Sequence, residues 1–193
     1  MPEHKNISIF EHLNVKPVIN GCGIYTDLGG SRLSPEVWAA MEEMNERFAH
    51  LPELMERAGT RIATMLGAEA ALITPGAAAG IMLGTAACMA GTDGAVSQRL
   101  PDVRGLKSEV LIQRSHRYKY DRQASMTGAN LVEVGSETGA SADDFTAAIN
   151  EDTGMILYPA HLESKAGSVP LEEVAAVAVR HDIPVFVDAA YMN

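Results

Sequence analysis

The chain has 193 residues, of which 47% are hydrophobic and 5% aromatic, and this composition favours a globular protein with its own core. Its net charge of −10, from 25 acidic and 15 basic residues, argues against nucleic-acid binding, because an acidic surface repels phosphate backbones. Cys22 and Cys88 form no CxxC pair, so neither a zinc knuckle nor a disulfide framework is indicated. We therefore expect a reduced, cytoplasmic protein.

The first part of the chain is loop-like to about residue 32, and two helices are expected to follow it. Ser34 is a candidate N-cap and Pro35 a candidate first helical residue. The second helix is expected to stop at Gly67. Apolar residues at helical spacing predict one inward face on each helix. These residues are Val37, Met41, Met44 and Phe48 on the first helix, and Leu54, Met55, Ala58, Ile62 and Met65 on the second.

From residue 70 onward, strand and helix patterns alternate. Strands are predicted at 70–74, 109–113, 130–134, 154–158 and 183–187, and helices at 76–90, 118–127, 141–150 and 170–181. This alternation predicts a mainly parallel sheet with helices on both faces, a three-layer α/β/α fold.

An uncharged run of 23 residues, 70–92, is long enough in principle to span a bilayer. Twelve of these residues are Gly or Ala, however, and Pro75 interrupts the run. A strand, a turn and a buried helix explain this composition better, so we expect no membrane segment.

Polar or small residues follow several of the predicted strands. In open parallel sheets the ligand crevice lies beyond the carboxyl ends of the strands. A turn of small residues, 76–79, follows the strand at 70–74, and His116, His161 and Asp188 come after three later strands. We expect these groups to lie at one edge of the sheet.

Each of these groups has a second interpretation. The start of the helix at Gly76 could bind a phosphate through free backbone N–H groups, or its recurring glycines could serve close packing. His116 could act in proton transfer or on a ring, or be an ordinary hydrogen-bonded histidine. Asp188 could pair with a cation, or cap the turn that follows its strand.

Four blocks of the sequence resemble, in order, a family of pyridoxal 5′-phosphate enzymes. The family is related to bacterial seryl-tRNA selenium transferase, has the aspartate aminotransferase fold (fold type I), and includes D-glucosaminate-6-phosphate ammonia-lyase. The blocks are "KPVINGCGIYTDLGGSRLSPEVWAAM", "ITPGAAAGIMLGTAAC", "VLIQRSHRYKYDRQASMTGANLVEVG" and "GSVPLEEVAAVAVRHDIPVFVDAA".

The resemblance implies a role for several residues. Gly76, Ala77 and Ala78 would present backbone N–H groups to the cofactor phosphate, and His116 would stack on the pyridine ring. Asp188 would bond the pyridine nitrogen and keep it protonated, so that the ring accepts electron density from the substrate. Arg32 would reach a substrate carboxylate or phosphate, and Arg114, Arg117 and Arg122 are weaker candidates of the same kind.

The resemblance also implies a lysine that forms the Schiff base with the cofactor, on a segment beyond Asn193. Neither Lys119 nor Lys165 occupies the matching position. We therefore expect this chain to be the N-terminal half of a longer enzyme, inactive alone, and to bind the cofactor weakly. The expected division is a segment lining the site, residues 1–34, and a partial cofactor-binding large domain, residues 35–193. The full-length protein is expected to be a homo-oligomer.

For the reaction, we expect a lyase that carries out α,β-elimination on an amino acid or an amino-sugar acid. The acidic balance and the short segment before residue 16 argue against a tRNA substrate. A pyridoxal-phosphate transferase, of the selenium transferase or aminotransferase type, is an alternative. Two further alternatives are a metal-dependent protein using His116, His161 and Asp188, and a non-catalytic protein that retains the fold.

Overall fold

The computed structural model describes residues 8–190, and it divides into two compact units, residues 1–71 and 72–193. Expectations that concern residues 1–7 or 191–193, the chain end at Asn193 among them, lie outside the described residues. The expected domain division at residue 34 stays a prediction. Each unit is described by itself.

The first unit is built from helices. They are α1 (Ile9–His12), the 3₁₀ turn η1 (Thr26–Leu28), α2 (Pro35–Asn45) and α3 (Leu51–Leu66). The ends of the two longer helices are as predicted, since the Ser34 side chain accepts from the backbone N–H of Val37 and Gly67 ends α3 in a left-handed conformation at φ 66°. The sequence had not predicted α1.

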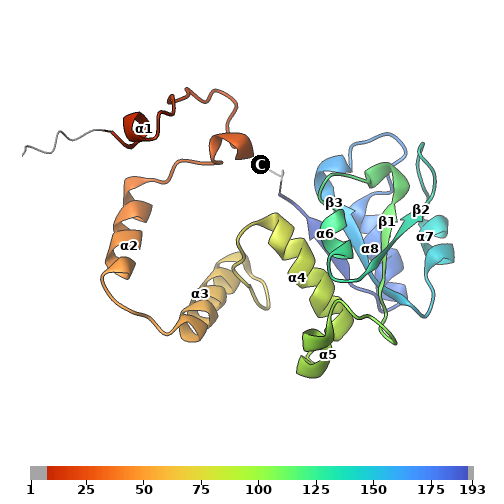
Figure 1. Cartoon of the computed structure of the whole chain (residues 1–193). Coiled ribbons are helices and arrows are strands. Elements are labelled where there is room, and N and C mark those ends of the chain that lie inside the picture. The colour runs from red at the N-terminus through yellow and green to blue at the C-terminus, as the bar shows by residue number, and fades with distance from the viewer. Residues whose placement is uncertain (1–7, 191–193) are drawn as a thin grey trace, which may run out of the picture. The chain divides into compact units, whose positions relative to one another are not determined.

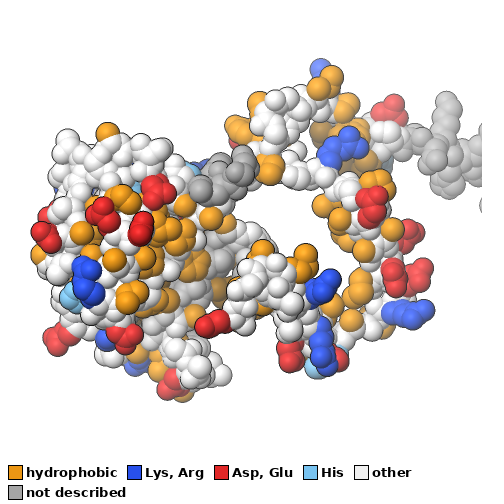
Figure 2. Space-filling view, turned by 180° about the vertical axis from the view of Figure 1, so that it is seen from behind, with side chains coloured by type: hydrophobic (Ala, Val, Ile, Leu, Met, Phe, Trp, Pro, Cys, Tyr) orange, Lys and Arg blue, Asp and Glu red, His pale blue; other side chains and the backbone are white. Residues whose placement is uncertain are grey.

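Among the described residues, the prediction that α2 turns its apolar face inward is wrong, and the same prediction for α3 holds only in part. Val37, Met41 and Met44 on α2 are exposed, and so is Phe48 just beyond it. On α3, Gly59 and Ala63 are buried and the predicted Met55, Ala58 and Ile62 are half-buried, while Leu54 and Met65 are exposed. Figure 2 shows hydrophobic side chains at the surface along this part of the chain. On α2 the apolar side chains therefore add little to a core, whereas α3 packs closely at Gly59 against the backbone of Ala71.

The second unit contains a parallel sheet of four strands in the order β2-β1-β3-β4 (Figure 1). The strands are β1 (Glu109–Gln113), β2 (Asn130–Val134), β3 (Thr153–Pro159) and β4 (Val185–Asp188). Every neighbouring pair is parallel, for example Leu157 beside Phe186. The predicted fold class is confirmed.

Helices cover both faces of this sheet, as side-chain alternation along each strand requires. On one face, residues of α4 (Ala77–Ala90) and α6 (Arg122–Ser125) pack on Val110, Ile112, Met155 and Leu157. On the other face, residues of α7 (Ala142–Ala148) and α8 (Leu171–Arg180) pack on Leu111, Ile156 and Tyr158. The remaining helix is α5 (Gly94–Arg99), which the sequence had not predicted.

One predicted strand is absent, because residues 70–74 form no strand in the described structure. Leu72 and Ile73 in this segment are exposed, and no described strand pairs with them. An apolar run becomes a strand only where a neighbour satisfies its backbone groups. The helix predicted at 118–127 is also shorter, since only Arg122–Ser125 is α-helical. No helix among residues 8–190 is long and apolar enough to cross a membrane.

Candidate functional site

Three strand ends of the second unit lie next to one another. The 3₁₀ turn η2 (Arg114–His116) follows β1, η3 (Ala160–Leu162) follows β3, and Asp188 is the last residue of β4. Because β1, β3 and β4 are adjacent parallel strands, their carboxyl ends meet at one edge. Helix α4 packs on β3 and β4 and begins at this same end of the sheet (Figure 1). The expectation that these groups share one edge is therefore confirmed by the topology.

Asp188, at the end of the outer strand β4, is buried, with 5% of its surface exposed. The Tyr118 hydroxyl donates to its Oδ2 at 2.5 Å, and the backbone N–H of Ala190 donates to its Oδ1 at 3.1 Å. Burial, together with the neighbouring Asp188 carboxylate, raises the pKa of Tyr118, so the phenol keeps its proton and remains a donor. The Tyr118 ring also meets the His161 ring edge-on, at 5.4 Å between centroids.

His116 is completely buried at the end of β1. Its Nε2 lies 2.6 Å from the Ser168 hydroxyl, which in turn donates to the Leu162 carbonyl at 3.1 Å. Its ring meets Tyr158 edge-on at 5.3 Å. Burial, and secondarily the charge of Lys165, lowers the pKa of His116 and favours the neutral ring. Nδ1 has no hydrogen-bond partner within residues 8–190.

A buried polar network fastens the loop after η3 to the end of β1. The Gln113 side chain donates to the Ser115 hydroxyl at 2.6 Å and accepts from the Val169 N–H at 2.9 Å. Lys165 donates from Nζ to the Ser115 carbonyl at 2.6 Å. This network holds His116 and Ser168 together. Sequence reasoning had missed it, although a glutamine closing an apolar strand, as in "EVLIQ", was a visible signal.

The start of α4 presents backbone donors that have no partner within the helix, at the same edge. Gly76 is the N-cap, at φ 109° and without a side-chain cap, and the first helical bond runs from Gly80 N–H to the Gly76 carbonyl. The N–H groups of the first helical residues, beginning with Ala77 and Ala78, therefore have no partner within the helix. A residue with a side chain would be strained at the φ of Gly76.

The second interpretation of the glycines on α4, that they allow close packing, holds for Gly84 and not for Gly76. A Cβ at Gly84 would overlap the ring of Phe186 on β4, whereas a Cβ at Gly80 would meet only the Thr74 hydroxyl at 3.8 Å. Gly84 therefore lets the helix approach the sheet, and Gly76 shapes the helix start. The two interpretations of the glycine pattern apply to separate residues.

The predicted arginines lie in both units. Arg32 lies in the first unit, exposed just before α2, and its substrate role stays a prediction. Arg114 pairs with Glu137 and Glu133, and Arg117 pairs with Asp121 and Glu133. These ion pairs already occupy two of the three arginines that were weaker candidates for anion binding. The third, Arg122, is exposed on α6, and its role stays a prediction. No group of three or more His, Cys, Asp or Glu side chains among residues 8–190 is arranged to hold a metal ion.

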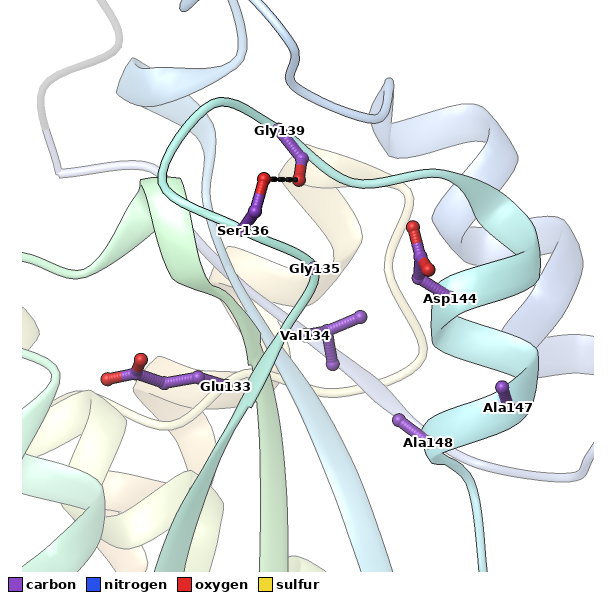
Figure 3. A pocket seen from close by; sticks show the side chains of 8 residues that line it. All are labelled: Glu133, Val134, Gly135, Ser136, Gly139, Asp144, Ala147 and Ala148. Carbon is purple, nitrogen blue, oxygen red and sulfur yellow. Dashed lines mark hydrogen bonds between the residues drawn. The ribbon is translucent and has the colours of Figure 1, made fainter.

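A separate pocket of about 470 Å³ lies between β2 and α7 (Figure 3). Its wall includes Glu133, Gly135, Ser136 and Asp144. The polar groups there are bonded to the protein, since Glu133 pairs with Arg117 and Asp144 accepts from Ser141. The pocket has no buried polar atom that lacks a partner among the described residues.

Comparison with known proteins gives relatives along nearly the whole chain. A 5′-C-glycyluridine monooxygenase-decarboxylase from Streptomyces sp is 34% identical over 94% of this chain and 47% of its own length. A D-glucosaminate-6-phosphate ammonia lyase from Salmonella typhimurium is 34% identical over 95% of this chain and 51% of its own. The L-seryl-tRNA(Sec) selenium transferase of Geotalea daltonii is 25% identical over 98% and 42%. The chain thus spans about half the length of the curated relatives it matches.

Solved structures agree with these relatives. The structure of D-glucosaminate-6-phosphate ammonia-lyase matches with a TM-score of 0.89 and 33% identity, over 95% of this chain and 51% of that one. Aspartate aminotransferase from Thermotoga maritima, at 14% identity and a TM-score of 0.53, shares the fold over 94% of this chain and 48% of that one. The family model for SelA, L-seryl-tRNA selenium transferase, matches residues 18–191. This chain therefore belongs to the L-seryl-tRNA selenium transferase family.

Proposed function

We propose that this chain supplies the cofactor-binding half of a pyridoxal 5′-phosphate lyase. The observation that carries the proposal is the buried Asp188 carboxylate at the end of β4, at the same sheet edge as the open N-terminus of α4. A phosphorylated pyridine carries an anion at one end and a basic ring nitrogen at the other. At this edge, the backbone N–H groups at the start of α4 can donate to the anion, and the Asp188 carboxylate can accept from the protonated ring nitrogen.

The arrangement of α4 and β4 fits a single ligand of this kind. Gly84 meets Phe186, and α4 runs against the strand direction (Figure 1). Ala77 lies seven residues before Gly84, about 10 Å along the helix. Asp188 lies two residues after Phe186, about 7 Å along the strand. The start of α4 at Ala77 and the end of β4 at Asp188 therefore both lie beyond the contact between Gly84 and Phe186, on the same side of it. This placement supports a single ligand that touches both.

Each residue then has a defined task. The N–H groups of Ala77 and Ala78 bind the phosphate, and the left-handed Gly76 opens the helix end to it. Asp188 holds a proton on the ring nitrogen. His116, neutral and buried at the end of β1, is proposed to stack on the pyridine ring, as the resemblance implies. When bound, the cofactor supplies an electron sink for charge that develops at the substrate α-carbon.

We propose an α,β-elimination from an amino acid or amino-sugar acid as the reaction of the whole enzyme. The match to the ammonia-lyase, in sequence and in fold, supports this choice. Arg32, from the first unit, is proposed to bind a substrate carboxylate or phosphate. We also propose a homo-oligomeric, cytoplasmic enzyme.

A second reaction has comparable support from one relative. The monooxygenase-decarboxylase from Streptomyces is as similar in sequence as the ammonia-lyase. Ammonia release and oxygen consumption by a protein that contains this chain separate the two reactions. Ammonia release without oxygen favours elimination, whereas strict dependence on oxygen overturns it.

Cofactor binding can be tested on the chain itself. Pyridoxine 5′-phosphate is a suitable probe, because it has no aldehyde that could react with surface lysines. We expect calorimetry to detect weak binding, reduced at least tenfold (roughly, for a lost bond between charged groups) by Asp188→Asn. Asp182→Asn is the control, since Asp182 is an exposed acid of the same unit. Absence of binding, or equal affinity in Asp188→Asn, contradicts the proposal.

A further inference from the structure

Tyr118 is the side chain that contacts Asp188 most directly, and the tasks assigned above do not include it. The hydroxyl of Tyr118 donates to Oδ2 of Asp188 at 2.5 Å across 70 residues of sequence. Tyr118 is half-buried, whereas His116 is completely buried. Of these two aromatic rings at the edge, Tyr118 is the one that retains exposed surface.

The backbone around Tyr118 is fixed by a buried acid. The carboxylate of Asp121, which is 4% exposed, accepts from the Tyr118 N–H at 3.1 Å and from Nε of Arg117 at 2.5 Å. On the other side, the His161 ring packs edge-on against the phenol ring. These contacts hold the hydroxyl in place before any ligand arrives.

The carboxylate of Asp188 accepts two hydrogen bonds from the protein and keeps acceptor positions free for a ligand. Tyr118 occupies one acceptor position of Oδ2, and the Ala190 N–H occupies one of Oδ1. An ionised carboxylate has about four acceptor positions, so each oxygen keeps one. Two donors on different oxygens fix the plane of the carboxylate, and a bond to a charged group is stronger than one between neutral groups.

We propose that Tyr118 is a positioning residue, which holds the Asp188 carboxylate in the orientation that accepts the N–H of a protonated pyridine ring. The inference rests on the proposed function. Tyr118 acts through Asp188 and not on the ligand itself. Removing its hydroxyl should therefore weaken only those ligands that have a ring nitrogen to offer to Asp188.

The experiment compares two ligands and two matched tyrosine variants of the chain. The ligands are pyridoxine 5′-phosphate and its analogue in which CH replaces the ring nitrogen. The variants are Tyr118→Phe and Tyr120→Phe, since Tyr120 is a half-buried neighbour whose ring centroid lies 6.3 Å from that of Tyr118. Calorimetry measures the affinity of each pair, and circular dichroism verifies that each variant is folded.

We expect Tyr118→Phe to weaken pyridoxine 5′-phosphate roughly tenfold and to leave the analogue unchanged. Tyr120→Phe should change neither affinity. In the Asp188→Ala background, Tyr118→Phe should have no further effect, because the acceptor of its hydroxyl has been removed. A purely structural role for Tyr118 would not distinguish ligands that differ in one ring atom.

The alternative outcomes separate this inference from the proposed function. Equal losses for both ligands, or a loss that persists in the Asp188→Ala background, overturn the positioning role while cofactor binding stands. Unchanged binding of pyridoxine 5′-phosphate by Tyr118→Phe also overturns the positioning role. A wild-type chain that binds neither ligand overturns the proposed function, and the inference with it.

Discussion

The two units use similar sequence patterns with opposite results. In the second unit, short apolar runs such as β1 and β3 are buried on both sheet faces, with Leu111, Ile112 and Ile156 fully buried. In the first unit, apolar residues at helical spacing form helices but remain exposed, as Met41 and Phe48 do. A periodic pattern therefore specifies an element, and only a partner surface turns its apolar face into a core.

The largest expected contrast is between two phenylalanines. Phe145 on α7 is 1% exposed, and Phe48 after α2 is fully exposed. We expect Phe145→Ala to lower the free energy of unfolding by about 3–5 kcal/mol, because it removes buried surface and leaves a cavity. Phe48→Ala should change it by no more than about 0.5 kcal/mol. Urea unfolding followed by circular dichroism measures both, and a large loss for Phe48→Ala would show that a surface covers this residue in solution.

A smaller effect is expected within α4, where two glycines differ in their surroundings. Gly84→Ala places a Cβ against the Phe186 ring, so we expect a loss of about 1–3 kcal/mol in unfolding free energy. Gly80→Ala has room and should be neutral or stabilising by up to about 1 kcal/mol, because alanine favours helix. The same urea titration compares the variants. Phe186→Leu should recover part of the loss in Gly84→Ala, and a failure to recover it argues against this contact as the cause.

The smallest expected effect is the pH dependence contributed by His116. Burial lowers its pKa in the folded state, with Lys165 and His161 adding to the shift and Glu163 and the Leu162 carbonyl opposing it. An unfolded histidine titrates near about 6.5, so the unfolded chain binds more protons just below that pH. Stability should therefore fall as the pH drops through this range.

The measurement is urea unfolding at several pH values, with His116→Gln and His181→Gln compared. His181 is exposed at the end of α8 and serves as the control. The slope of stability against pH should decrease in His116→Gln and persist in His181→Gln. An unchanged slope in His116→Gln would contradict the assignment.

Local sequence was sufficient for several elements. The strands at 109–113 and 130–134 agree with β1 and β2 in both bounds, because each is a short run of apolar, mainly β-branched or leucine residues between polar or turn residues. Ser34, Pro35 and Gly67 marked helix ends through their own backbone chemistry. The run at 70–74 failed because its strand character depended on a neighbour that the described sheet does not provide.

The candidate site, too, could be predicted from the sequence only in part. The sequence placed Gly76, His116 and Asp188 at strand and helix ends, and parallel topology requires such ends to share an edge. Sequence spacing gave no indication that Tyr118 would contact Asp188, since 70 residues separate them. It also gave no indication that Ser168 and Tyr158 would enclose His116.

The sequence by itself determined where the four strands lie, the start of α2, the end of α3 and the order of the polar groups along the chain, because these follow from backbone preferences over a few residues. The tertiary structure decided which apolar faces are buried, which arginines are already paired and which hydroxyl meets the carboxylate of Asp188. Those outcomes depend on contacts between segments far apart in the chain, and no local pattern encodes the distance between them.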